Sequence, residues 1–461
     1  MYTVLDQKKP QKGSISTMSL SFFDVKIDSF SSVCSEFVEK FRLLATLRSA
    51  GARKLRGTPI KRIIGFLISS IFANGSSFNQ QKFSVEGDGI PSYRATNRFL
   101  SSEYVDWCRV TAETAAEIIT TELDPISSKA KEDGVKTFRC LVADDTPFKR
   151  DRSSEVEKAV KCYDHASHSY FNGFRDLHLV YTDGISTIPV SHCLMSEKIE
   201  GSDKRCHMQM NDALFDMIAD CQIAGVRADY LLFDSWFGSP KDIKRGNAMG
   251  YDVICMVKKA KTKYLTETGR LMTVKSIFSS SKKRRGRSRY LLSTEVTLPD
   301  STQKAKLVFV RNRSNRKDWL VLLSTDLELS EDEVVAAYSQ RWNIETFFKN
   351  YKQDLRAVSR CRARKYSVVN ANCAIAMIQY MVMAVEKRIQ SDSRTLGELF
   401  VSILDAGVIE TLSRAVDELS SLFASEVSKR FGVDEMELRN QINEILELYI
   451  SAFKVSIERA A

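Results

Sequence analysis

FRCLVADD, residues 138–145, is a largely apolar run that ends in two acidic residues. A run of this kind, without alternating polar positions, is typical of a strand buried on both faces of a sheet. The stretch YLLFDSWF, residues 230–237, repeats the pattern and also meets an acidic residue, Asp234. Both stretches therefore predict central strands of an α/β sheet, each running into a carboxylate.

Further elements lie around these two strands. DLHLVYTDGISTIPVSHCLMS (176–196) predicts a β-hairpin that turns at Asp183-Gly184. A helix is expected over residues 206–225, a short helix over 239–250 and a fifth strand over 251–259. The order of three strands, helix, strand, helix, strand is that of a ribonuclease H-like sheet. We therefore expect an α/β fold with a mixed sheet flanked by helices.

Composition points to the kind of partner. The chain has 461 residues, too many for one hydrophobic core, and 68 Lys+Arg against 58 Asp+Glu give a net charge of +10. A basic balance favours a polyanion, most simply nucleic acid. Ten cysteines without a CxxC pair, and only five histidines, argue against a zinc ribbon or a disulfide scaffold. Reduced, buried thiols predict a cytoplasmic protein, and the expected nucleic-acid partner would place it on the nucleoid.

The most apolar stretch does not suit a membrane. AIAMIQYMVMAV, residues 374–385, is twelve residues long and contains a Gln, whereas a membrane span needs about 20 residues. It predicts a buried helix, and we expect no membrane partner. We divide the chain into a basic helical N-terminal DNA-binding region (1–130), a first part of the sheet domain (131–259), an all-β insertion (260–325), a second part of the sheet domain (326–390) and a helical C-terminal region suited to dimerisation (391–461).

Acidic residues mark the ends of both buried strands. Carboxylates are disfavoured in apolar strands unless they are paired or bind a metal, and sites form at the carboxyl ends of strands in α/β sheets. If the two strands are neighbours, Asp144 and Asp234 converge at one edge. Each acid taken singly could instead be a turn former or a helix N-cap.

A third carboxylate comes from YSQRWNIETFFKNYK, residues 338–352. On one continuous helix at about 100° per residue, four polar residues fall within a stripe roughly 60° wide, beside an apolar face that can pack on the sheet. These are Tyr338, Arg341, Glu345 and Lys352. The other interpretation is a solvated helix face with an Arg341–Glu345 pair. Three converging carboxylates would suit Mg²⁺ or Mn²⁺, and the two cations would neutralise phosphate.

These residues resemble a known family. The spacing Tyr-x2-Arg-x3-Glu-x6-Lys matches the YREK signature of DDE transposases of insertion-sequence family four. LVADDTPFKR (141–150) resembles their first-Asp motif, and FDSWFGSP (233–240) closely resembles their second. The order of two Asp motifs, a β-rich insertion and a Glu on a helix is also theirs. The resemblance covers about residues 137–385.

The resemblance implies a catalytic and metal-binding triad of Asp144, Asp234 and Glu345, with Mg²⁺ or Mn²⁺ as the cofactor. Asp145 is the alternative to Asp144, which we favour because it directly continues the strand. Tyr338, Arg341 and Lys352 would contact phosphates of the transposon end. The implied function is cut-and-paste transposition by metal-dependent phosphodiester hydrolysis and strand transfer at terminal inverted repeats. Its partners would be double-stranded DNA, at both the element's ends and the target, and a second copy of the chain in a synaptic complex.

Two other functions and one further surface remain open. A related metal-dependent nuclease would share the triad without strand transfer, and a transposition inhibitor would bind DNA without catalysis. The segment SKKRRGRSR, residues 281–289, is either a solvated loop or a DNA contact. Its candidate DNA-binding residues are Lys282, Lys283, Arg284 and Arg285.

Overall fold

The computed structural model describes most of the chain, over residues 30–54, 56–72, 90–132, 136–152, 155–164, 166–195, 210–286, 288–312, 315, 318–445 and 448. The first 29 residues of the expected N-terminal region and the last 13 of the expected C-terminal region lie outside this part.

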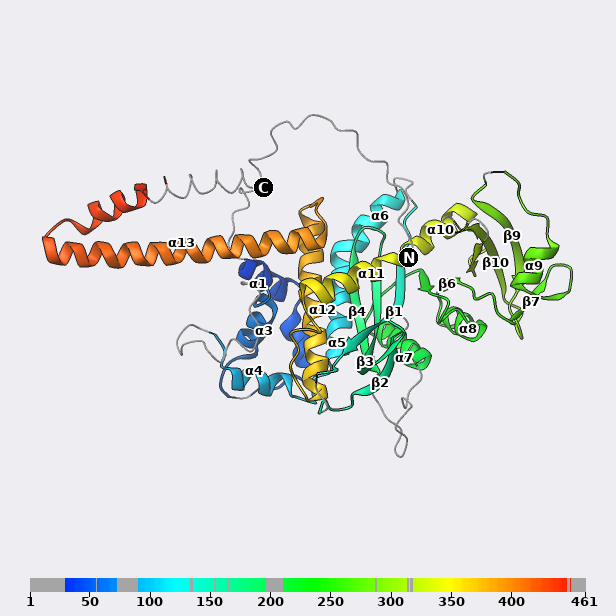
Figure 1. The fold of residues 1–461 in the computed structure, drawn as a ribbon, viewed down its shortest axis with the longest axis horizontal. Helices are drawn as coiled ribbons and strands as arrows, with labels where there is room; N and C mark the ends of the chain where they lie inside the picture. The colour runs from blue at the N-terminus through cyan, green and yellow to red at the C-terminus, as the bar shows by residue number, and fades with distance from the viewer. Residues whose placement is uncertain are drawn as a thin grey trace.

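A mixed sheet forms the centre of the molecule (Figure 1). Its central strands run in the order β4-β3-β1-β5-β6, with β1 antiparallel to β3 and parallel to β5, and β5 parallel to β6. This is the ribonuclease H-like arrangement expected from the order of elements. The strands are β1 (Cys140–Lys149), β3 (Ser169–Thr182), β4 (Thr187–Met195), β5 (Tyr230–Phe233) and β6 (Asp252–Met256).

One strand of the sheet was not expected. β2 (Val160–Asp164) pairs with the first five residues of β3, and the part of β3 from Arg175 onward pairs with β4. Its sequence, VKCYD, is short and half polar, so it lacks the apolar run that predicts a buried strand. β2 lies at one end of the sheet order, where such a strand can have one solvated face.

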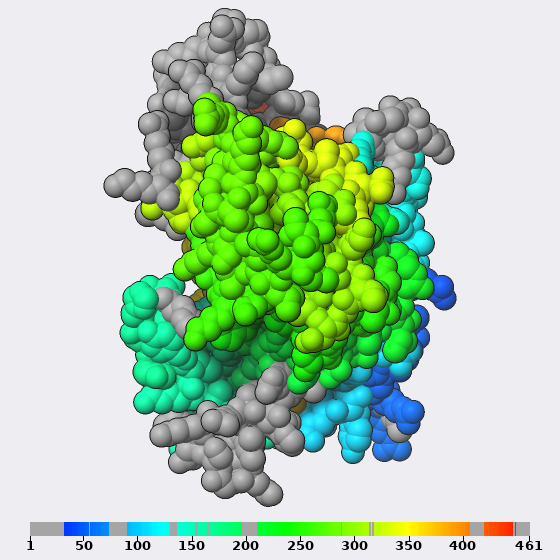
Figure 2. All heavy atoms as spheres, turned by 90° about the vertical axis from the view of Figure 1, so that its right-hand side faces the viewer, coloured from blue at the N-terminus to red at the C-terminus, as the bar shows by residue number. Residues whose placement is uncertain are grey.

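The insertion continues the central sheet. Its last strand, β11 (Trp319–Ser324), pairs antiparallel with β6, so all eleven strands of the described residues belong to one sheet. The remaining strands are β7 (Lys263–Thr266), β8 (Leu271–Thr273), β9 (Tyr290–Thr297) and β10 (Lys304–Arg311). A short helix, α9 (Val274–Ser280), is the one departure from an all-β segment within the described residues. Figure 2 shows this segment covering most of one face of the molecule, with the start of the following helical region beside it.

Helices cover the sheet and extend beyond it (Figure 1). The N-terminal helices pack around α5 and α12. The helix α3 begins directly after Pro59, because proline lacks the backbone N–H that would extend a preceding helix but is tolerated at a helix start. The helices are α1 (Phe30–Lys40), α2 (Leu43–Ser49), α3 (Ile60–Ser69), α4 (Tyr93–Leu100), α5 (Trp107–Ile118), η2 (Ile119–Leu123), α6 (Asp124–Glu132), α7 (Met210–Ile223), α8 (Pro240–Ala248), α10 (Glu331–Ser339), α11 (Trp342–Lys349), η3 (Asn350–Asp354), α12 (Tyr366–Ile389) and α13 (Leu396–Phe431).

The most apolar helix lies in the core. α12 is long and apolar enough to cross a membrane by length and composition, but 89% of its most apolar window is buried inside the protein. It packs on β4, α5 and α3. This burial agrees with the core helix expected over residues 374–385. By contrast, α13 extends away from the body as an arm (Figure 1).

Candidate active site

Two carboxylates meet at the ends of adjacent parallel strands. In the register of β1 and β5, Ala143 is the partner of Phe233. The next residue on each strand is Asp144 or Asp234, so the two acids lie side by side, on strands spaced about 4.8 Å apart. Asp234 caps the turn that follows, because its Oδ1 accepts from the backbone N–H of Trp236 at 2.7 Å. Its carboxylate is therefore held at the sheet edge.

The two adjacent acids of β1 point to opposite faces of the sheet, as successive strand residues must. Asp144 Oδ2 accepts a hydrogen bond from Arg341 Nη1 at 2.9 Å. Asp145 instead forms an ion pair with Arg175 on the neighbouring strand β3. Asp145 is thus engaged by a cation on its own face, whereas Asp144 faces the helical segment that carries Glu345.

The segment 338–352 is not the single continuous helix expected from the sequence. It is divided into the end of α10, a turn at Gln340–Arg341, α11 and the π-helix η3. The turn uses short-range bonds, such as the backbone N–H of Arg341 to the carbonyl of Tyr338 at 3.0 Å. The wider π-helical turn also changes the angle per residue. A uniform 100° per residue, and with it the 60° stripe, does not describe these side chains.

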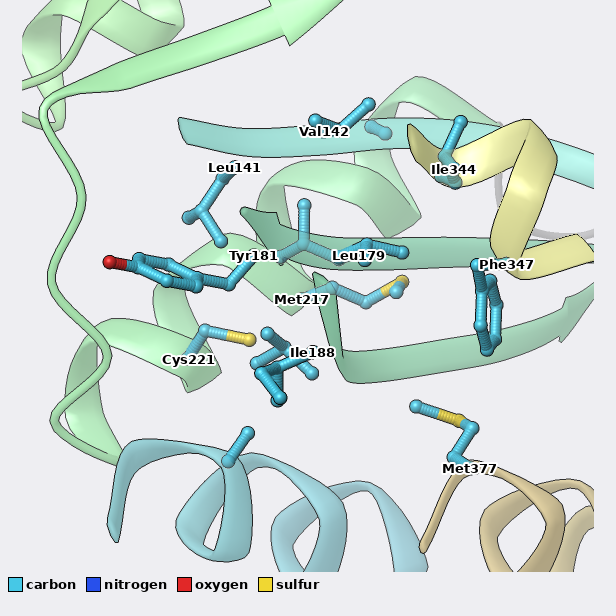
Figure 3. Packing of buried hydrophobic residues seen from close by; sticks show 14 of the residues in the cluster. Leu141, Val142, Leu179, Tyr181, Ile188, Met217, Cys221, Ile344, Phe347 and Met377 are labelled. Atoms are coloured by element: carbon cyan, nitrogen blue, oxygen red, sulfur yellow. The ribbon is translucent and has the colours of Figure 1, made fainter. Parts of the chain in front are cut away.

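The apolar side of α11 still packs on the sheet as expected. Ile344 and Phe347 are fully buried, and Figure 3 shows Ile344 beside Val142 of β1 and Phe347 between the sheet and Met377 of α12. This packing fixes the orientation of α11, so Glu345 lies on its other side, partly exposed. Arg341 Nη1 lies 3.7 Å from Glu345 Oε1 and also contacts Asp144. One guanidinium group therefore links the β1 acid to the helix acid.

The electrostatics indicate an incompletely neutralised acidic cluster. Burial raises the pKa of Asp144 to about 7; Arg341 opposes this shift, while the nearby Asp234 and Glu345 add to it. Burial would lower the pKa of Arg341, but its attraction to Tyr338, Asp144 and Glu345 raises it overall. A buried carboxyl with like charges beside it favours the protonated form unless a cation approaches. The three acids supply the oxygen ligands that a divalent cation prefers.

The other two expected site residues lie near this cluster. Tyr338 is close enough to Arg341 to affect its pKa. Lys352 is half-buried in η3, with its Nζ 5.7 Å from the ring centroid of Phe348. Burial lowers the pKa of Lys352, opposed by the acids around it, Asp176 and Glu345 first. Lys352 therefore contributes positive charge to the same region as Glu345.

The basic residues of the insertion lie in a separate segment, between α9 and β9. Lys282 and Arg285 are exposed. Arg284 forms an ion pair with Glu331 at the start of α10, and its Nη2 donates to Glu331 Oε1 at 2.7 Å. Lys283 Nζ lies 4.9 Å from the ring centroid of Phe278. All four residues lie in one loop. Within the described part of the chain, Arg284 has an ion pair and Lys283 a ring contact, whereas Lys282 and Arg285 have neither.

The motif positions next to the acids have different roles in the fold. Arg150 donates to the carbonyls of Cys361 and Ala363, which ties β1 to the segment before α12. Lys149 forms an ion pair with Asp164 at 2.8 Å. Both cations of the first-Asp motif therefore have structural partners.

The chain also matches a known family of proteins. Residues 136–382 match the family model described as the transposase DDE domain. The chain belongs to the DDE transposase family. The match spans more than half of the chain, from the strand that ends at Asp144 to the buried helix α12. Enzymes of this family act on DNA with a divalent metal ion as cofactor, and the three acids described above have the chemistry to hold one.

Other comparisons add little. A solved structure, the "Drosophila P element transposase strand transfer complex", is 11% identical, and the match covers 89% of this chain and 98% of that chain with a TM-score of 0.22. At this TM-score the match gives no information about the fold or function of this chain. No curated protein matches.

Two features of this DDE transposase were not predicted from its sequence. A cavity of about 120 Å³ lies between α3, α4, α12 and the segment after η3, and its wall includes Arg356, Arg360 and Arg362. Arg360 Nη2 is buried without a hydrogen-bond partner among the described residues. The signal was available, because LRAVSRCRARK (355–365) is rich in Arg. The second feature is a buried cluster around Asp176; its two histidines share the predicted hairpin with Asp176, but Cys373 comes from a helix almost 200 residues later.

Proposed function

We propose that this chain is the transposase of a mobile element of insertion-sequence family four, moving it by cut-and-paste transposition. The observation that carries the proposal is the β1–β5 register, which sets Asp144 beside Asp234, together with the Arg341 contact that brings the Glu345 helix to them. Metal-dependent hydrolysis at the terminal inverted repeats would expose a 3′-OH, which then attacks the opposite strand and later the target.

Asp144, Asp234 and Glu345 are proposed as the metal-binding and catalytic triad, with Mg²⁺ as the cofactor and Mn²⁺ as its substitute. The ions would activate the attacking oxygen and stabilise the leaving oxygen of an in-line phosphoryl transfer. The first strand contributes Asp144 rather than Asp145, because Asp145 is already paired with Arg175 on the other face. The raised pKa of Asp144 supports this role, since its charged form needs a cation beside it.

The cations of the segment 338–352 would hold the DNA. Arg341 donates to Asp144 in the metal-free protein. A cation bound to the acids would neutralise the charge of Asp144, and Arg341 would then be available to bind a phosphate of the DNA. Lys352 lies on the same side of the sheet and would bind a second phosphate as a point charge. Tyr338 would donate a hydrogen bond or stack on a base. These contacts would orient the scissile bond over the acids, and orientation supplies much of the rate in phosphoryl transfer.

The wider DNA surface is proposed on charge and exposure. Lys282 and Arg285 would reach DNA from the insertion, with Lys283 and Arg284 following once their present contacts yield. The N-terminal helices (residues 30–132) would bind the inverted repeats. We also assign DNA contact to the arginine-lined cavity, because Arg360 has an unpaired nitrogen there. The protein would act as a homodimer that holds two ends together in a synaptic complex, in the cytoplasm on nucleoid DNA.

The test uses DNA duplexes carrying the element's two ends, with Mg²⁺ or Mn²⁺, and resolves nicked, hairpin and strand-transfer products. We expect Glu345→Gln to reduce all three by at least about two orders of magnitude, because one metal-binding carboxylate becomes neutral. Glu328→Gln is the matched control, since Glu328 is exposed outside the acidic cluster, and it should keep full activity. Undiminished products with Glu345→Gln would refute the triad.

The same reaction separates the alternatives. Nicks without strand-transfer products would identify a nuclease. Binding of the correct ends without any cleavage would identify a non-catalytic transposition inhibitor.

A further inference from the structure

Three side chains with different ligand atoms meet in the core beside the acidic cluster, one strand over from Asp144, whose partner on β3 is His178. They are Asp176 of β3, His192 of β4 and Cys373 of α12, and their ligand atoms all lie within 4.8 Å of one another. All three residues are fully buried. His192 Nδ1 lies 3.1 Å from Asp176 Oδ1. The chain thus brings a carboxylate, an imidazole and a thiol together from three elements.

A second imidazole and a phenol complete the cluster. His178 Nε2 lies 2.9 Å from Asp176 Oδ2, and the two histidine rings are stacked with their centroids 5.7 Å apart. The Tyr351 hydroxyl donates to Asp176 Oδ2 at 3.1 Å. Tyr351 is the residue directly before Lys352 in η3. The cluster therefore lies beneath the segment that we propose contacts DNA.

Polar atoms of this cluster are left without partners. Among the described residues, both ring nitrogens of His178 and Nε2 of His192 are buried and accept or donate no hydrogen bond. Within the described part of the chain, His178 Nε2 has only the ion-pair contact with Asp176, at 2.9 Å. Each unpaired buried group costs about 1–3 kcal/mol. A cation bound beside Asp176 would give a partner to one ring nitrogen of each histidine that binds it.

We propose that Asp176, His192 and Cys373 bind a structural Zn²⁺ ion; His178 lies outside this group and would have to move toward it to act as a fourth ligand. A thiolate with imidazole and carboxylate is a ligand set for zinc, whereas Mg²⁺ and Mn²⁺ prefer oxygen ligands. Tetrahedral zinc with bonds of about 2.0–2.3 Å needs neighbouring ligand atoms about 3.3–3.8 Å apart, and the three ligand atoms of this set already lie within 4.8 Å of one another.

The burial of the site indicates a structural role. A catalytic zinc keeps an open position for water or substrate, whereas a structural zinc is closed by protein ligands. With every ligand fully buried, the ion would join β3 and β4 to α12 and support Tyr351 from below. It would differ in ligands, metal and place from the ion proposed at Asp144, Asp234 and Glu345, although its bearing on DNA binding rests on the proposed function.

The test measures zinc in the purified full-length chain by mass spectrometry after a wash with a weak chelator. We expect about one zinc per chain, and its loss in Cys373→Ala and in His192→Ala. Cys361→Ala is the matched control, because Cys361 is another buried cysteine, in the segment between η3 and α12, but outside the ligand set, and it should retain the ion. Glu345→Gln should also retain it, which separates this site from the catalytic one.

A second measurement covers variants that fail to fold. Wild-type chain loaded with Co²⁺ in place of Zn²⁺ should show a thiolate-to-cobalt charge-transfer band in the near ultraviolet. A wild-type chain that holds no zinc after incubation with Zn²⁺, or that gives no thiolate band with Co²⁺, would overturn the site. Equal zinc in Cys373→Ala and wild type would overturn it as well. None of these outcomes depends on whether the chain transfers DNA strands.

Discussion

In the metal-free fold, Asp144 keeps its proton up to about pH 7, far above the usual range of an aspartic acid. Its pKa is raised to about 7, so the folded protein binds a proton that the unfolded chain releases at about pH 4. The sign follows from linkage: between these pH values the folded state binds more protons, so stability falls as pH rises and levels off above about 7.

We predict that Asp144→Asn stabilises the metal-free protein at pH 8 by about 1–4 kcal/mol, because it removes a buried carboxylate with like-charged neighbours. Urea unfolding in chelator at pH 5 and pH 8 measures the effect. The gain should be small at pH 5, where the wild-type acid is largely protonated. Equal gains at both pH values would contradict the assigned protonation.

Metal removal gives a second prediction for the same residue. Mg²⁺ added at pH 8 should raise the unfolding free energy of wild type, because ligands of the folded state stabilise it by mass action. Asp144→Asn should lose most of this gain. A titration of the unfolding midpoint against Mg²⁺ concentration checks it, and an equal gain in both proteins would place the ion elsewhere.

At the scale of elements, the turn after β5 depends on one glycine. A Cβ at Gly238 would lie 2.7 Å from the carbonyl oxygen of Met256 in β6, a separation that backbone atoms cannot accept without moving. Because this turn holds Asp234, we expect Gly238→Ala to cost about 1–3 kcal/mol of stability and to reduce cleavage about tenfold or more.

The matched control is Gly65→Ala, in the middle of α3, where an added Cβ meets nothing within 4 Å. It should stabilise the protein by up to about 1 kcal/mol. Thermal unfolding and the end-cleavage reaction are measured on both variants. If Gly238→Ala behaved like Gly65→Ala, the turn would not constrain Asp234.

The elements also show what the sequence could predict. The central strands β1 and β5 were predictable because long apolar runs ending in acids have few other structures, whereas β2 and the pairing of the insertion with β6 were not. The break at Gln340–Arg341 was not predictable, since neither proline nor glycine marks it. Tertiary contacts set it instead: Arg341 reaches Asp144 on a strand almost 200 residues earlier. The part of the Asp176 cluster that could not be predicted is the approach of Cys373 and Tyr351, which lie about 175–200 residues after Asp176 in the chain.

Across the whole molecule, the charge of +10 makes DNA affinity depend on salt. If Lys282 and Arg285 each neutralise one phosphate, the double variant Lys282→Ala, Arg285→Ala should reduce the slope of log affinity against log salt concentration by about 1.8. Fluorescence anisotropy with end DNA at several salt concentrations measures the slope.

A second pair of exposed cations in the same segment serves as the control. Lys263 and Arg270 lie at the β7–β8 hairpin, apart from the proposed DNA loop. Replacing both with Ala removes the same charge and should change the slope less. Equal changes from the two pairs would indicate attraction by net charge rather than contact by the loop.

The pairing of β11 with β6 has a consequence for how such a chain could be shortened. The insertion leaves the central sheet after Met256 and returns opposite it at Leu322, so its entry and exit are neighbours across an antiparallel pair. In the sheet topology, the whole insertion takes the place of the loop in a hairpin of β6 and β11, and this loop contains strands of its own. A tight turn of a few residues between Val257 and Val321, whose backbones are already bonded at 3.0 Å, would close the hairpin again. Such a minimal chain would retain all three acids yet lack the basic loop, turning the insertion into an exchangeable cassette.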